Sequence, residues 1–94
     1  MLYQKGGKIL YRVNYTVEFT HTLDGPPRQV RRKYQWRITA NTDQQAMRKG
    51  KHLIAKERRS HRKGTIVKMI SLVRVDKPAI HISEAATVLW QAKK

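Results

Sequence analysis

The stretch Ile9–Thr20, which reads ILYRVNYTVEFT, decides the fold. Its apolar side chains fall on odd positions and its even positions are mostly polar, with Leu10 as the exception. Successive side chains of a β-strand point to opposite faces of the sheet, so this alternation predicts a strand with one buried face. The β-branched and aromatic residues in the stretch favour the same structure.

A second strand is expected from Arg28 to Ala40, where alternation resumes after Asp-Gly-Pro-Pro at 24–27. These turn residues interrupt the ladder, and so short a connection predicts an antiparallel hairpin. Apolar and aromatic side chains, Tyr34 and Trp36 among them, share one face of this strand, which predicts that they are core residues. The other face carries polar and cationic side chains: Arg31, Lys33, Gln35, Arg37 and Thr39.

A helix is predicted from Asp43 to Ser60, with Thr42 as its N-cap. At 100° per residue, one side of it is apolar and the other cationic. Gly50 falls within the apolar stripe, which indicates close approach of the helix to the sheet.

A third strand is expected over Thr65–Val75. Apolar residues occupy both odd and even positions there, which indicates either a strand covered on both faces or a bulge between Met69 and Ile70.

The predicted fold is a small α+β domain of order β-β-α-β. One amphipathic helix packs on a sheet of three strands, or of four, and a short C-terminal helix is expected from Glu84 to Gln91. Residues 1–94 are taken as a single domain, with 1–8 as a flexible N-terminus and 77–94 as a C-terminal extension.

Composition excludes several classes of protein. The chain has 94 residues, and 21 Lys+Arg against 6 Asp+Glu give a net charge of +15. Without cysteine there is no disulfide framework and no thiolate metal site. No apolar segment is long enough for a membrane span or a signal peptide, so we expect a soluble protein in the cytoplasm, or in the host cytoplasm if it is phage-encoded.

The residues that catalysis requires are scattered. The six carboxylates form no short-spaced pair, and the four histidines lack the spacing of a metal site. We therefore expect no enzyme activity, no cofactor and no metal. A small ribonuclease toxin that uses His61 or His81, with Arg and Lys as phosphate stabilisers, stays a third reading of the sequence.

The basic residues are concentrated in two segments. Eight Lys/Arg and one acid lie between Arg48 and Lys63, and five Lys/Arg and no acid lie between Arg28 and Arg37. A helix with so few acids cannot neutralise itself by internal ion pairs, which indicates a polyanionic partner. The candidate binding residues are Arg48, Lys51, His52, Lys56, Arg59, Arg62 and Lys63 from the helix and its loop, and Arg31, Lys33 and Arg37 from the strand.

The preferred partner is duplex DNA or structured RNA, bound through its phosphates by a non-catalytic protein. The aromatic residues lie on the apolar face of their strands. We therefore do not expect bases to stack on an exposed face of the sheet. The alternative is a phage accessory protein or mobile-element modulator, similar to an anti-CRISPR inhibitor, that docks on an acidic or nucleic-acid-binding surface of a host protein complex. The two basic segments are expected to face in opposite directions, with the helix favoured and Arg28 and Arg32 at the hairpin end as a second patch.

The segment Ser60–Lys68, SHRKGTIVK, and the β-β-α-β order resemble the archaeal LX ribosomal proteins, which place a Gly/Ser-His-Arg/Lys segment between helix and last strand. The resemblance covers only these residues, and the loop and C-terminal tail have no counterpart in it. It implies structured RNA as the ligand.

Overall fold

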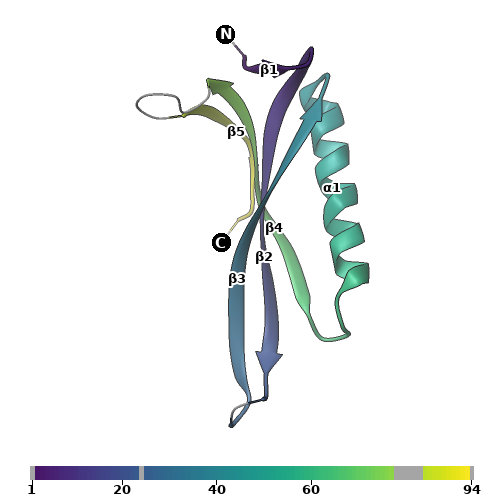
Figure 1. Ribbon diagram of the computed structural model, residues 1–94, viewed down its shortest axis with the longest axis vertical. Helices are drawn as coiled ribbons and strands as arrows, with labels where there is room; N and C mark the ends of the chain where they lie inside the picture. The colour runs from purple at the N-terminus through teal and green to yellow at the C-terminus, as the bar shows by residue number, and fades with distance from the viewer. Residues whose placement is uncertain (1, 24, 78–83, 94) are drawn as a thin grey trace.

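The computed structural model describes residues 2–23, 25–77 and 84–93. In this part of the chain one helix packs against an antiparallel sheet of five strands, which confirms the α+β class (Figure 1). The elements in chain order are β1 (Gln4–Lys5), β2 (Lys8–His21), β3 (Arg28–Ala40), α1 (Asp43–Ser60), β4 (Ile66–Lys77) and β5 (Ala85–Gln91).

Strand β2 is the centre of the sheet. Strand β3 pairs with it from Ile9 to His21, β4 pairs with it from Tyr11 to Glu18, and β1 pairs with its first two residues. Strand β5 pairs with β4, so β3 and β5 are the two edges. Strands β3 and β4 are parallel to one another on either side of β2, and α1 connects them as in a split βαβ unit.

Helix α1 has the bounds that the sequence predicts, and Thr42 is its N-cap. The backbone N–H of Gln45 donates to Thr42 Oγ1 at 3.1 Å, and the Gln45 side chain accepts from the backbone N–H of Asn41 at 2.6 Å. The buried side of the helix contains Ala46, Gly50 and Ile54. A Cβ at Gly50 would lie 3.4 Å from Val13 Cγ2, so the helix approaches β2 closely at this point.

The core lies between α1 and one face of the sheet. The odd-numbered residues of β2 are its centre: Tyr11, Val13, Tyr15 and Val17 are at most 3% exposed. Val67 and Leu72 of β4 and Ala40 of β3 complete it beside the helix. The bulge considered for the third strand is present, because Tyr15 pairs with Met69 and Asn14 with Ser71, which leaves Ile70 as the extra residue.

The sheet is larger than predicted, and the expected C-terminal helix is wrong. The residues Ala85–Gln91 form strand β5, and Gln4–Lys5 add the short strand β1. The segment contains Thr87, Val88 and Trp90, which favour a strand once a partner edge such as β4 is available. Between β1 and β2, Gly6 and Gly7 both have positive φ, as a two-residue hairpin loop of type I′ requires.

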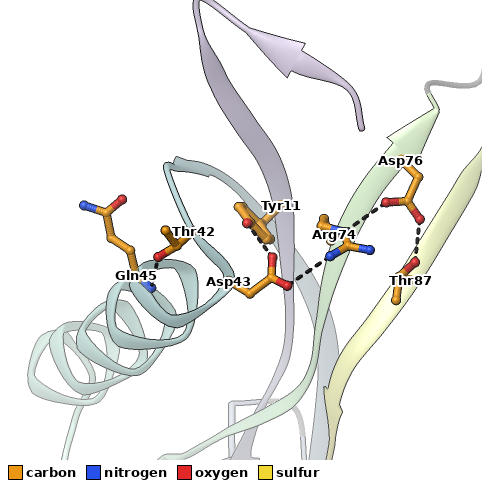
Figure 2. A network of polar contacts seen from close by, with 7 residues as sticks. All are labelled: Tyr11, Thr42, Asp43, Gln45, Arg74, Asp76 and Thr87. Atoms are coloured by element: carbon orange, nitrogen blue, oxygen red, sulfur yellow. Dashed lines mark hydrogen bonds and ion pairs between the residues drawn. The ribbon is translucent and has the colours of Figure 1, made fainter. Parts of the chain in front are cut away.

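A chain of polar contacts joins the helix start to three strands (Figure 2). Both carboxylate oxygens of Asp43 accept hydrogen bonds, one from the Tyr11 hydroxyl at 2.7 Å and one from Arg74 at 2.9 Å. Arg74 also donates to Asp76 at 2.9 Å, and Asp76 accepts from Thr87 of β5 at 2.5 Å. Two acids are thereby used to connect α1, β2, β4 and β5.

Candidate nucleic-acid interface

The outward side of α1 and the loop after it carry a continuous set of basic side chains, here called the helix surface. Its members are the seven residues predicted from the sequence, and all seven are exposed: Arg48, Lys51, His52, Lys56, Arg59, Arg62 and Lys63. Two neighbouring cations are held by the backbone, since Lys49 donates to Thr39 O at 2.7 Å and Arg58 to Val67 O at 3.0 Å.

The one acid between Arg48 and Lys63, Glu57, makes its polar contacts with Tyr15 and His61, outside this set. The Glu57 carboxylate accepts a hydrogen bond from the Tyr15 hydroxyl at 3.3 Å and lies 3.7 Å from His61. Among the described residues no carboxylate forms an ion pair with an arginine or lysine of the helix surface. The positive charge of the helix surface is therefore not neutralised by the described part of the protein.

The three predicted strand residues lie on a second surface, here called the sheet surface. Arg31, Lys33 and Arg37 are exposed and pair across the ladder with Glu18, Thr16 and Arg12, on the face opposite Tyr15 and Val17. A depression of about 950 Å³ lies here, with Arg31, Lys33, Gln35 and Lys68 in its lining.

Charges on the sheet surface are partly paired. The Arg31 guanidinium donates to Glu18 at 2.8 Å, and Arg12 forms an ion pair with Glu84. Arg32 lies on the other face of β3, with its guanidinium 5.6 Å from the centre of the Phe19 ring. Because α1 covers the face that carries Tyr15, the helix surface and the sheet surface point away from each other, and the structure does not bring the two predicted sets together.

Between α1 and β3 runs a groove of about 730 Å³, which sequence reasoning missed. Trp36, Ile38 and Leu53 provide its apolar lining. Arg48, His52 and Lys56 of the helix surface line it as well, together with Gln45, Lys49 and Glu57. Three predicted phosphate-binding residues therefore border an aromatic ring.

The expectation that Trp36 and Tyr34 are core residues is wrong. The groove lies where α1 leaves Trp36 partly uncovered. Trp36 is 44% exposed and Tyr34 is 43% exposed, although both lie on the helix side of the sheet. Helix α1 begins beside the end of β3 but must reach the start of β4, so it diverges from β3 and lies alongside β4 (Figure 1). The only sequence signal for the divergence of α1 from β3 is the two-residue link Asn41–Thr42. This link fixes where α1 starts but not the direction in which it runs.

The exposed indole is held in place by hydrogen bonds. Trp36 Nε1 donates to the Tyr15 hydroxyl at 2.5 Å, and that hydroxyl donates in turn to Glu57. The rings of Tyr15 and Tyr34 stack with their centres 5.5 Å apart. Burial is the main cause that raises the pKa of Tyr15, although the hydrogen bond from Trp36 acts in the opposite direction. Tyr15 therefore stays protonated, as its donation to Glu57 requires.

Of the two histidines named for the ribonuclease reading, His81 lies outside the described residues. Residues 2–23, 25–77 and 84–93 contain no group of three or more His, Cys, Asp or Glu side chains that could hold a metal ion. None of the helices within these ranges is long and apolar enough to cross a membrane.

Comparison with known proteins gives no relative. The chain matches no protein-family model, and no curated protein or solved structure matches it. The likeness to the archaeal LX ribosomal proteins thus rests on Ser60–Lys68 and the element order alone.

Proposed function

We propose that this protein is a non-catalytic nucleic-acid-binding protein that contacts the phosphates of duplex DNA or structured RNA through the helix surface. One observation carries the proposal: the cations of the helix surface are exposed, and the described acids are engaged elsewhere. A surface of this kind attracts a polyanion, and phosphate contacts release its condensed counterions.

The placement of the acids supports this reading. Five of the six acids lie in the described residues, while Asp24 lies outside them. Asp43 and Asp76 belong to the network around Arg74, Glu57 is bound to Tyr15 and His61, and the remaining two pair with Arg31 and Arg12. None of the five forms an ion pair with an arginine or lysine of the helix surface, although Glu57 lines the groove together with Arg48, His52 and Lys56.

The dimensions of the helix surface suit a nucleic acid. Arg48 and Arg59 are eleven positions apart, which corresponds to about 16 Å along an α-helix. Duplex DNA carries one phosphate charge per roughly 1.7 Å of its axis, so several phosphates come within reach of this length. The sheet surface is the weaker candidate, because Glu18 already pairs with Arg31 and Glu84 pairs with the neighbouring Arg12.

Salt dependence tests the proposal. The helix surface contains six Lys/Arg, and six phosphate contacts to duplex DNA give a slope of log K against log salt of about −5. Fluorescence anisotropy with a labelled duplex at several NaCl concentrations measures this slope. A flat salt dependence would contradict the phosphate-contact mechanism.

A pull-down from cells with and without nuclease distinguishes the two kinds of partner. Nucleic acid bound to the helix surface is lost after nuclease treatment, whereas an acidic protein stays bound in constant proportion. The second result would support the alternative of a modulator that docks on a protein complex.

A further inference from the structure

We propose that the groove between α1 and β3 accepts one unstacked nucleobase against Trp36, so that the protein prefers nucleic acid with a bulged or looped-out base over uniform duplex. This inference rests on the proposed function, because the helix surface must first hold the phosphates. It adds a preference for nucleic acid with an unstacked base, which phosphate contacts alone do not give.

The groove has the size and lining of a site for a flat aromatic ligand. Its volume of about 730 Å³ lies within the range of roughly 300–1,000 Å³ that small-molecule sites occupy. Trp36, Ile38 and Leu53 supply apolar surface, and polar side chains surround it. A base that stacks on an aromatic side chain typically gains several-fold to more than a hundredfold in affinity.

The indole is already oriented for stacking. Its only polar atom, Nε1, donates to Tyr15, so the exposed part of Trp36 offers hydrocarbon ring surface. The Tyr15 hydroxyl of β2 in turn donates to Glu57 of the helix, so Trp36 of β3 is connected to α1 through Tyr15. A side chain held in this way loses little conformational entropy when a ligand binds.

The cations at the groove select a base that is attached to phosphates. Arg48, His52 and Lys56 belong to the helix surface and also line the groove. A strand whose phosphates lie along these residues brings its bases next to Trp36. Lys51 is equally exposed but does not line the groove, so it contacts phosphates only.

The test compares two RNA hairpins that differ by a single bulged adenine in the stem. We expect the bulged hairpin to bind at least about fivefold more tightly to the full-length protein. In a Trp90→Phe background Trp36 is the single tryptophan, and its emission should be quenched by the bulged hairpin much more than by the paired one. The same hairpins made as DNA show whether the 2′-hydroxyl contributes.

Variants separate stacking from charge. Trp36→Leu should abolish the preference and change affinity for the paired hairpin by less than about twofold, whereas Trp36→Phe should keep part of the preference. Lys51→Glu and Lys56→Glu each reverse one positive charge, at two different positions around the same helix. Lys51→Glu should weaken both hairpins equally, and Lys56→Glu should weaken the bulged hairpin more. Circular dichroism checks that each variant folds.

The outcomes distinguish the two proposals. If neither hairpin binds, the proposed function fails and this inference fails with it. If the paired hairpin binds with the expected salt dependence but the bulge gives no preference, or the preference survives in Trp36→Leu, only the inference is overturned. Quenching of Trp36 by poly-glutamate but by neither hairpin would also overturn it, in favour of an acidic peptide.

Discussion

The helix surface and the sheet surface contain the same residue types but differ in how their charges are used. On the sheet surface Arg31 pairs with Glu18, and the neighbouring Arg12 pairs with Glu84. On the helix surface the single nearby acid, Glu57, turns inward to Tyr15. The difference shows that the positions of the few acids, more than the number of cations, decide which face presents unneutralised charge.

Reversing charge on the two surfaces gives the largest expected difference. The triple variant Arg48→Glu, Lys56→Glu, Arg59→Glu should weaken duplex binding by at least about a hundredfold, because each charged contact contributes about 1.5–3 kcal/mol. Gel retardation or anisotropy at fixed salt measures the loss.

The sheet surface provides the matched control. Lys33→Glu, Arg37→Glu and Lys68→Glu change the net charge by the same amount, and the described structure gives none of the three an ion pair. We expect this variant to lose less than about tenfold in affinity. If it loses as much as the helix variant, binding depends on net charge or on the sheet, and the distinction between the surfaces is wrong.

Unfolding at acid pH tests whether the Asp76 carboxylate stabilises the fold. The hydrogen bond from Thr87, and then that from Arg74, hold the pKa of Asp76 below its ordinary value of 3.8. Since the unfolded chain takes up the proton first, this contribution is present above about pH 5 and is lost as pH falls toward the folded pKa. Urea unfolding from pH 7 to pH 3 should therefore show a shallower loss of stability for Asp76→Asn than for the parent protein.

The same variant also bears on binding. Because Asp76 lies in the network with Arg74 and Thr87, away from the helix surface, Asp76→Asn should leave duplex affinity at pH 7 unchanged. Equal acid sensitivity in both proteins, or weakened binding at pH 7, would show that the network has another role.

The smallest expected effect comes from freeing one cation on the weaker surface. Glu18→Gln removes the partner of Arg31, and exposed ion pairs of this kind are worth about 0–1 kcal/mol. Duplex affinity at low salt should rise by less than about fivefold. A larger gain would mean that the sheet surface contacts the ligand directly.

Most of the fold could be predicted from residue patterns. The period-two alternation of Ile9–Thr20 and Arg28–Ala40 and the capped helix from Asp43 to Ser60 depend on local sequence, and all three are present. The helix expected over Ala85–Gln91 is wrong because the helical pattern there is weak, and pairing with the edge of β4, the preceding strand, overrides it.

The candidate site was predictable only in part. Exposure of Arg48, Lys51 and Lys56 follows from the helical period alone. The groove could not be predicted in this way. The alternation of residues in β3 places Trp36 on the helix side of the sheet but does not show how far the helix extends over that side. That depends on the direction of α1 between β3 and β4, which only the tertiary arrangement sets.

Strand β2 has partners on both sides, and they become available at different times as the chain folds. Pairing with β3 closes the short loop at residues 22–27, whereas pairing with β4 closes a loop roughly eightfold longer, at an added entropic cost of about 2 kcal/mol. We expect the β2–β3 hairpin to form first and to place Tyr15 beside Trp36 before α1 docks. One wall of the groove would then exist early and the other only in the finished fold, so occupancy of the groove would report completed folding.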